Sequence, residues 1–419
     1  MLKMQIPPAL KNRKFLLLWL GLMVSIAGTQ MQVAAIHWHI RELTGMPDPL
    51  ALGGIGLARI LPVIVFSVFG GVFADTYNRR VILFITQTGM ALTALGLAVL
   101  TFSGQTQIWH IYLLTALQAA AMAFDSPARQ AIVPNIVPAR DLPNAFSLNS
   151  IAFNVGAVLG PVLSGIIIAT IGQGYTYLFN AISFLGVILA LLAIGPIPQD
   201  VRSVGGVSFS VIMEGFRFIF SRKIILSTMV MDFFATFFAA ANTMLPIIAR
   251  DILKVGEVGY GLLGAASSSG SVLAAFIVSQ LPTIRKQGPV FLVAVIVFGL
   301  ATVAFGFAQS FWLAFLALAL MGASDSISTI IRNTIRQLNT PDHIRGRMTS
   351  INQIFFQGGP QLGEVRAGLV ASALGVPFAI MSGGIWTIIA ALLIMTKWPV
   401  LRQYDTHEPV PRPAPASTD

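Results

Sequence analysis

The feature that most constrains the fold is a succession of long apolar stretches that recur along nearly the whole chain. A helix needs roughly 20 apolar residues to cross the hydrocarbon core of a bilayer. Hydrophobic residues make up 55% of the chain and charged residues only 10%, whereas a soluble domain carries about 25% charged residues. A soluble protein with this composition would lack the polar surface to cover itself, so we predict an all-α membrane protein.

We predict twelve transmembrane helices in two pseudo-symmetric six-helix halves. Spans 1 to 6 are expected near residues 15–40, 50–74, 81–103, 108–125, 145–171 and 175–195. Spans 7 to 12 are expected near residues 224–248, 258–281, 289–308, 311–331, 348–372 and 377–396. The predicted organisation is therefore two halves and two other segments: a first half at 1–195, a cytoplasmic linker at 196–223, a second half at 224–396 and a tail at 397–419.

The two segments outside the halves have distinct compositions. Residues 208–220 of the linker are amphipathic and are expected to form a helix along the membrane surface. The tail ends in a proline-rich run and is predicted to be disordered and cytoplasmic.

The basic residues indicate how the chain is oriented. Most of the 26 Lys and Arg residues fall in loops on the side of the two termini, and we place Arg332 and Arg336 among them. Arg41, Arg250 and Lys254 fall on the opposite side. Because cytoplasmic loops carry such an excess, we expect both termini in the cytoplasm and the chain in a plasma membrane, the bacterial inner membrane. Topology and anionic lipid then explain the net charge of +10, and no nucleic-acid partner is expected.

The sequence gives no sign of covalent chemistry. The chain has no cysteine and five scattered histidines, so we expect no metal site, and we expect no cofactor. It contains no Ser/His/Asp or zinc constellation and no nucleotide-binding loop of the Gly-x₄-Gly-Lys-Ser/Thr type. We therefore predict that the protein is not an enzyme and does not couple to ATP within this chain.

Two motifs carry expectations about movement. The loop at 71–80 reads GVFADTYNRR. We expect Gly71 to let a neighbouring helix approach, and Asp75 to face the positive N-terminus of a partner helix. Arg79 and Arg80 are expected at the cytoplasmic interface, where all four residues would serve gating. The alternative is an ordinary basic loop.

Span 5 contains the second motif, GAVLGPVLSG at 156–165. Gly156 and Gly160 lie four residues apart, a spacing that gives a helix a close-packing face. Pro161 adds a bend whose freed carbonyl must be satisfied nearby. On spacing alone this motif indicates packing; we also assign its three residues to conformational change.

These motifs resemble those of the major facilitator superfamily, in which a loop glycine precedes an aspartate by four and basic residues follow. Further similar segments lie at 15–20, 124–130, 141–145, 215–218 and 346–347. Together they are similar to a branch that contains the bacterial enterobactin exporter and multidrug and macrolide efflux proteins. The resemblance implies a major facilitator fold, and the motif in span 5 is similar to one found in antiporter branches, which favours export.

The sequence also departs from the superfamily pattern. Thr76 stands where a basic residue usually follows the aspartate. Thr115 stands three residues before Gln118, where many proton-linked drug exporters carry an arginine. Proton coupling cannot be carried over through that position.

Four ionisable residues, Arg59, Asp232, Glu364 and Arg366, fall within predicted spans, where charges are costly and are functional candidates. Arg59 in span 2 and Glu364 in span 11 both lie about 12 Å from the outer end of their helix. Spans 2 and 11 meet between the halves in the resembling superfamily, so we predict an Arg59–Glu364 ion pair that joins the halves on the outer side. The alternative is two solvated side chains at a cavity mouth.

The candidates for substrate contact are both acidic and neutral. Asp232 is followed by an apolar run that includes Phe233 and Phe237. A single acid in such an adaptable wall would attract a cationic lipophilic solute, unless these residues face lipid. Gln30 in span 1 and Gln118 in span 4 are the neutral polar candidates.

The sequence thus predicts a secondary active transporter that works by alternating access. Its expected activity is export of a small amphipathic compound, of the drug or siderophore class, driven by an ion gradient that is expected to be of protons. The alternatives are an importer or lipid flippase on the same fold, and a membrane receptor that transports nothing. The expected partners are the small-molecule substrate, the coupling proton and membrane lipid, and the expected state is a monomer.

Overall fold

The structure is a computed structural model that describes residues 7–197, 199, 209–240, 242–281 and 284–405. The side chains of several helical residues, Asp75 among them, also lie outside the described part. Within the described residues the elements are helices and no strand is present.

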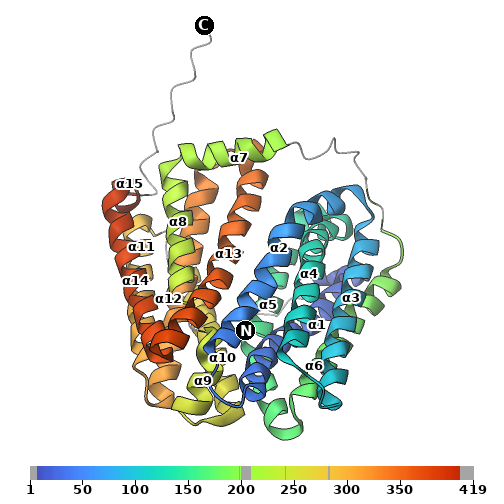
Figure 1. Ribbon diagram of the computed structural model, residues 1–419. Coiled ribbons are helices and arrows are strands. Elements are labelled where there is room, and N and C mark those ends of the chain that lie inside the picture. Colours follow the sequence, from blue (N-terminus) through green and yellow to red (C-terminus); the bar gives the residue numbers. More distant parts are fainter. Residues whose placement is uncertain (1–6, 198, 200–208, 241, 282–283, 406–419) are drawn as a thin grey trace, which may run out of the picture.

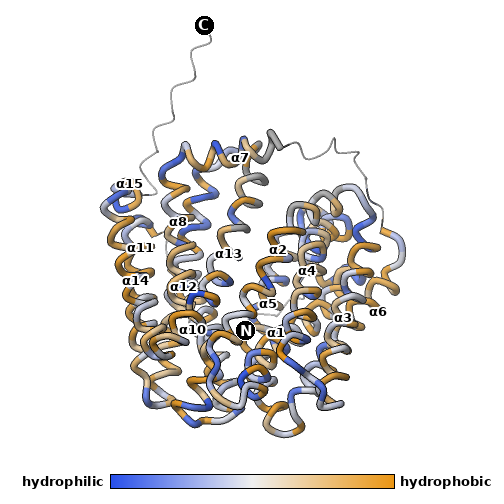
Figure 2. Tube along the Cα trace, viewed as in Figure 1, coloured by the Kyte–Doolittle hydropathy of each residue, from blue (hydrophilic) through white to orange (hydrophobic). Residues whose placement is uncertain are grey.

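The helices form two bundles that stand side by side and diverge toward one end (Figure 1). The first bundle contains α1 (Arg13–Leu43), α2 (Pro49–Thr76), α3 (Arg79–Phe102), α4 (Ile108–Ile136), α5 (Leu142–Ile171) and α6 (Gln173–Ile194). The second contains α8 (Lys223–Phe238), η3 (Asn242–Met244), α9 (Leu245–Ile247), η4 (Ile248–Ile252), α10 (Gly256–Gln280), α11 (Gln287–Gly306), α12 (Phe311–Leu338), α13 (Asp342–Leu374) and α14 (Val376–Lys397). Apolar residues run along most of the helix lengths (Figure 2).

Among the described residues, 10 helical stretches are long and apolar enough to cross a membrane. The remaining long helices, α4 with 29 residues and α13 with 33, are also long enough to span. Both are more polar because they carry charges such as Asp125, Arg129, Glu364 and Arg366. Twelve spans are thus consistent with the structure.

Equivalent turns mark the corresponding places in the two halves. Gly172 separates α5 from α6 with φ 95°, and Gly375 separates α13 from α14 with φ 89°. A residue with a Cβ rarely adopts this left-handed backbone, so glycine allows each helix to reverse direction without an intervening loop. Side chains cap the N-termini of two other helices. The Asn12 side chain accepts hydrogen bonds from backbone N–H groups in the first turn of α1, and the Asp48 side chain accepts one from the first turn of α2.

Span 7 is broken, whereas we predicted a continuous helix at 224–248. The α-helix α8 ends at Phe238, and the chain resumes as η3, α9 and the π-helix η4. Arg366 of α13 stabilises the break, because its Nη1 donates to the Phe238 carbonyl at 2.6 Å and its guanidinium lies 5.7 Å from the Phe238 ring. A cation at a helix C-terminus is favourable. Arg366 of α13 is therefore bound to the C-terminal end of α8.

The expected surface helix is present as α7 (Phe209–Ser221), which crosses the end at which the bundles diverge (Figure 1). We call this the α7 end. The prediction of a disordered tail from residue 397 is wrong as far as residue 405. There α15 (Pro399–Arg402) buries Leu401, and Asn339 Nδ2 donates to the Tyr404 hydroxyl at 2.9 Å. Apolar side chains fix this segment, and residues 406–419 lie outside the described part.

Candidate functional site

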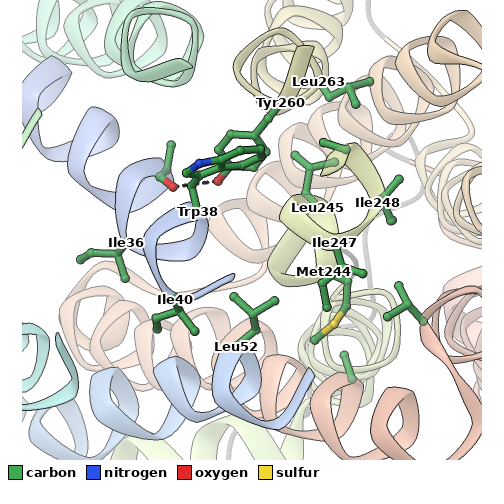
Figure 3. Packing of buried hydrophobic residues seen from close by; sticks show 14 of the residues in the cluster. Ile36, Trp38, Ile40, Leu52, Met244, Leu245, Ile247, Ile248, Tyr260 and Leu263 are labelled. Carbon is green, nitrogen blue, oxygen red and sulfur yellow. Dashed lines mark hydrogen bonds between the residues drawn. The ribbon is translucent and has the colours of Figure 1, made fainter. Parts of the chain in front are cut away.

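The two halves meet at the end opposite α7, in a region that we call the seal. Its apolar part is one core that draws on α1 and α2 from the first half and on α9, η4 and α10 from the second (Figure 3). The labelled side chains of the first half are Ile36, Trp38, Ile40 and Leu52, and those of the second are Met244, Leu245, Ile247, Ile248, Tyr260 and Leu263. Burial of this core holds the halves together at the seal.

Polar bonds cross the seal next to that core. Arg41 Nε donates to Asp251 Oδ2 at 2.7 Å and its Nη2 to Oδ1 at 2.5 Å, a two-pronged pair between α1 and η4. The Tyr260 hydroxyl donates to the Ala34 carbonyl at 2.8 Å, and its ring lies 5.2 Å from that of Trp38. Arg41 lies in the last turn of α1 and not, as predicted from the sequence, in a loop. The pair was missed because its partners stand 210 residues apart and only folding brings them together.

The predicted ion pair between spans 2 and 11 is present in the seal. Arg59 Nη1 lies 3.8 Å from Glu364 Oε1, with the two side chains 19% and 15% exposed. At this separation the groups attract each other without a hydrogen bond. Glycines allow α2 and α13 to come this close, because a Cβ on Gly53 would lie 3.0 Å from the Gly368 Cα.

The glycine–proline motif of α5 faces two helices. A Cβ on Gly156 would lie 3.3 Å from the Ala27 Cα, and one on Gly160 would lie 2.5 Å from the Gln30 Cβ, so both glycines pack on α1. Gln30 therefore lies against α5.

The end of the same motif crosses to the other half. A Cβ on Gly261 of α10 would lie 2.5 Å from the Pro161 carbonyl oxygen and 3.1 Å from the Gly165 Cα. The motif thus packs within the first half and forms part of the seal.

Gln118 belongs to a chain of polar side chains inside the first half. Gln32 Nε2 donates to Gln118 Oε1 at 2.7 Å, and Asn180 Nδ2 donates to Gln32 Oε1 at 2.6 Å. Gln32 and Asn180 are not among the predicted site residues, although an uncharged polar residue inside an apolar span is a signal of this kind. The chain of hydrogen bonds ties α1, α4 and α6 together.

Asp232 is paired, so the expectation of a single acid in an apolar wall is wrong. Arg332 Nη1 of α12 lies 2.6 Å from Asp232 Oδ1, and the two side chains are 1% and 2% exposed. Asp325 lies 3.7 Å from the same nitrogen and is 44% exposed. Arg332 neutralises Asp232 within the second half, which removes the physical reason for a preference for cations.

Arg332 and Arg336 do not lie in a loop, contrary to our assignment. The helix α12 continues to Leu338, and both arginines are buried. Arg336 donates hydrogen bonds to Asn333 and Asn352. Span 10 is longer than predicted because these charges find partners on neighbouring helices and therefore need no water.

The two phenylalanines predicted near the substrate lie between α8 and α13. Phe233 and Phe237 stack with ring centroids 5.9 Å apart, and Phe233 lies 6.2 Å from Phe355 of α13. Both side chains are partly buried, so each contacts other protein residues and is not exposed to lipid only.

The loop motif connects helices of the first half. Arg79 binds the Ala74 carbonyl at 3.0 Å, the Ala131 carbonyl at 3.2 Å and Asn135 Oδ1 at 2.6 Å. Arg80 Nε donates to the Leu191 carbonyl at 2.8 Å. These bonds join α2, α3, α4 and α6 near the α7 end.

Gly71 does not have the role that we expected. A Cβ there would meet nothing within 4 Å, because Gly71 points away from α4 and the preceding Gly70 faces Ala123 of that helix. The side chain of Asp75 lies outside the described part, so its contact with a partner helix stays a prediction.

Comparison with known proteins agrees with this architecture. A family described as transmembrane secretion effector matches residues 6–416. The enterobactin exporter EntS of Citrobacter koseri is 26% identical over 349 residues, which are 83% of each chain. The staphyloferrin A transporter of Staphylococcus aureus is 25% identical over 85% of this chain and 89% of its own. The multidrug efflux pump Tap of Mycolicibacterium fortuitum is 25% identical over 87% and 91%.

Solved structures show the same fold. A bacterial homologue of the human lysosomal transporter Spinster, in an inward-facing and unoccupied conformation, has a TM-score of 0.73 at 15% identity and covers 97% of this chain. A D-xylose–proton symporter has a TM-score of 0.67 over 90% of this chain. With a family match from residue 6 to 416 and this fold, the protein is an integral membrane transporter of the major facilitator superfamily and belongs to its transmembrane secretion effector family.

Proposed function

We propose that this protein is a secondary active transporter that exports a small amphipathic compound of the siderophore or drug class by alternating access. The observation that carries the proposal is the seal, since the contacts between the halves described above gather at one end while the bundles diverge at the other (Figure 1). A carrier that alternates its access must close one end and open the other around a central site. With the seal closed, the central site of such a carrier would be accessible from the α7 end.

The direction of transport is proposed from two further observations. The loops at the α7 end carry most of the basic residues, which supports a location of that end, together with both termini, on the cytoplasmic side of an inner membrane. The enterobactin exporter and the efflux pump Tap are relatives named for outward transport. The conformation would then face the cytoplasm, from which an exporter takes up its substrate. The chain has no nucleotide-binding loop, so an ion gradient is the proposed source of energy.

Gating is proposed at both ends of the carrier. Arg59 and Glu364 would latch the outer side, and the loop motif with Asp75, Arg79 and Arg80 would act on the cytoplasmic side. Gln30, Gln118, Phe233 and Phe237 stay candidates for substrate contact, because they lie on α1, α4 and α8 at partly buried positions.

Transport by the purified protein in vesicles of both orientations tests the function. The vesicles would hold an imposed pH gradient and be offered dyes, drugs, enterobactin and staphyloferrin A. We expect gradient-dependent movement of at least one amphipathic compound from the cytoplasmic face outward. Asp75→Asn should keep expression but slow this movement. Movement only toward the cytoplasmic face would identify an importer, and movement of labelled lipid alone would identify a flippase; either result would overturn the proposal.

The latch gives a sharper prediction. Arg59→Glu or Glu364→Arg alone would place two like charges in the seal, and we expect a loss of at least about tenfold in transport rate, the factor that corresponds to about 1.4 kcal/mol. The double variant Arg59→Glu with Glu364→Arg should recover part of that loss. Arg140→Glu is the matched control, because Arg140 is 86% exposed in a 3.8 Å pair with Asp141 and should matter little. A double variant no better than either single one would count against the latch.

A further inference from the structure

Two side-chain oxygens in the seal are buried without a hydrogen-bond partner. They are Gln361 Oε1 and Glu364 Oε2, both on α13. Residues three apart on a helix are neighbours on its surface. The α2 side of the seal backs this face, because a Cβ on Gly56 would lie 2.3 Å from the Gln361 carbonyl oxygen and 3.0 Å from the Glu364 Cβ. A buried acceptor left without a donor is costly, so the site needs a hydrogen.

The charged neighbours of Glu364 leave this need unmet. Arg59 of α2 faces the other carboxylate oxygen at 3.8 Å, without a hydrogen bond. The Thr243 hydroxyl of η3 also lies close to the carboxylate, but Glu364 Oε2 has no hydrogen-bond partner. Arg366 on the same helix donates to the Phe238 carbonyl, and Asp232 of α8 is bound to Arg332. The other titratable side chains in the electrostatic neighbourhood of Arg59 are His37 of α1 and Tyr260 of α10, which are hydrogen-bonded to the Val33 and Ala34 carbonyls.

We propose that Glu364 and Gln361 form the site at which this carrier binds its coupling ion, and that the ion is a proton. The inference rests on the proposed function. A proton on Glu364 Oε2 would let that oxygen donate to Gln361 Oε1, which satisfies both unpartnered oxygens with one hydrogen. Hard metal cations take about six oxygen ligands, whereas two unpartnered side-chain oxygens are found here among the described residues.

The position of the site connects proton binding to the movement of the halves. When ionised, Glu364 attracts Arg59 and holds the seal closed. When Glu364 is protonated, it loses that attraction. The outward-open state is therefore more populated in the protonated carrier than in the ionised carrier. An empty carrier without a proton would therefore stay closed on the outer side until substrate or a proton breaks the pair. That restriction prevents the empty carrier from cycling, which an exchange of substrate for protons requires.

Both carboxylate oxygens of Asp232 also lack a hydrogen-bond partner, but Asp232 is less suited to this role than Glu364 because of its place in the fold. Its ion pair with Arg332 joins α8 to α12 within one half, at 2.6 Å and 1% exposure. Movement of the halves as units leaves that pair unchanged. The Glu364 site lies between the halves, so its surroundings change whenever the seal opens.

The test measures the seal directly, without substrate. The chain has no cysteine, so Met46→Cys and Phe307→Cys, which are 69% and 64% exposed at the seal end of the two halves, provide unique sites for spin labels. Distances would be recorded in lipid nanodiscs from pH 5 to pH 8. We expect the fraction of long distances to rise as the pH falls. Glu364→Gln should show a high fraction that does not change with pH, and Gln361→Leu should shift the transition to lower pH, because the protonated carboxyl loses its acceptor.

Matched controls separate this site from its surroundings. Asp251→Asn breaks the Arg41 pair in the same seal and should raise the long-distance fraction while the pH response persists. His37→Gln should also keep the response. A pH response that survives in Glu364→Gln, or that His37→Gln abolishes, would overturn the proposal. Opening caused by sodium chloride and not by choline chloride at constant pH would overturn the proton as the ion. Because no transport is measured, these outcomes are independent of the vesicle experiment.

Discussion

Asp232→Asn is expected to destabilise the folded carrier by about 3–5 kcal/mol, because it leaves the buried Arg332 with only the more distant and half-exposed Asp325 as a counter-ion. The two side chains are 1% and 2% exposed and 2.6 Å apart, so water cannot replace the lost carboxylate. The measurement is the midpoint of thermal unfolding of the purified protein in detergent. The double variant Asp232→Asn with Arg332→Gln removes both charges and should recover most of the midpoint.

Asp325 offers the matched control for this pair. It faces the same arginine nitrogen at 3.7 Å but is 44% exposed, so Asp325→Asn should cost less than about 1 kcal/mol. Equal midpoints for wild type and Asp232→Asn would show that Asp325 alone is sufficient to balance the charge of Arg332, and would contradict the prediction. A double variant as unstable as the single one would assign the loss to packing, not to charge.

Gly165→Ala is expected to shift the carrier away from the conformation in which the seal is closed. The new Cβ would lie 2.5 Å from the Glu257 carbonyl oxygen and 3.0 Å from the Gly261 Cα, both in the backbone of α10. Backbone atoms cannot turn aside as a side chain can. Overpacking costs about 1–3 kcal/mol, which is borne only while the halves touch. The ratio of outward-open to inward-open carrier should rise about 5- to 150-fold, as measured by the labels at positions 46 and 307.

Gly89→Ala in α3 is the control for this substitution. A Cβ at Gly89 meets nothing within 4 Å, so the distances should match those of wild type. Gly261→Ala approaches the same contact from α10 and should act like Gly165→Ala. If both seal variants keep the wild-type distances, α5 and α10 accommodate the added methyl group without a cost in free energy. The seal would then not depend on their close approach.

The Arg59–Glu364 pair shows how far a sequence can lead toward a contact. Position along each helix gives depth, since each residue advances about 1.5 Å, and the resemblance states which helices meet. Depth and neighbour together were sufficient for this pair. They were insufficient for Asp232, because the assignment of Arg332 to a loop hid its partner, and for Arg366, whose target at Phe238 arises only where α8 breaks.

By itself, the sequence determined the class of protein, the number of spans, their order and the surface helix, because each follows from local apolar length and charge that the bilayer selects segment by segment. Only the tertiary structure decided how the buried charges pair and which faces form the seal. The Arg41–Asp251 pair and the contact of Gly165 with Gly261 join residues from opposite halves. Their energy depends on distances of a few ångströms between helices, and a pattern along one chain does not contain those distances.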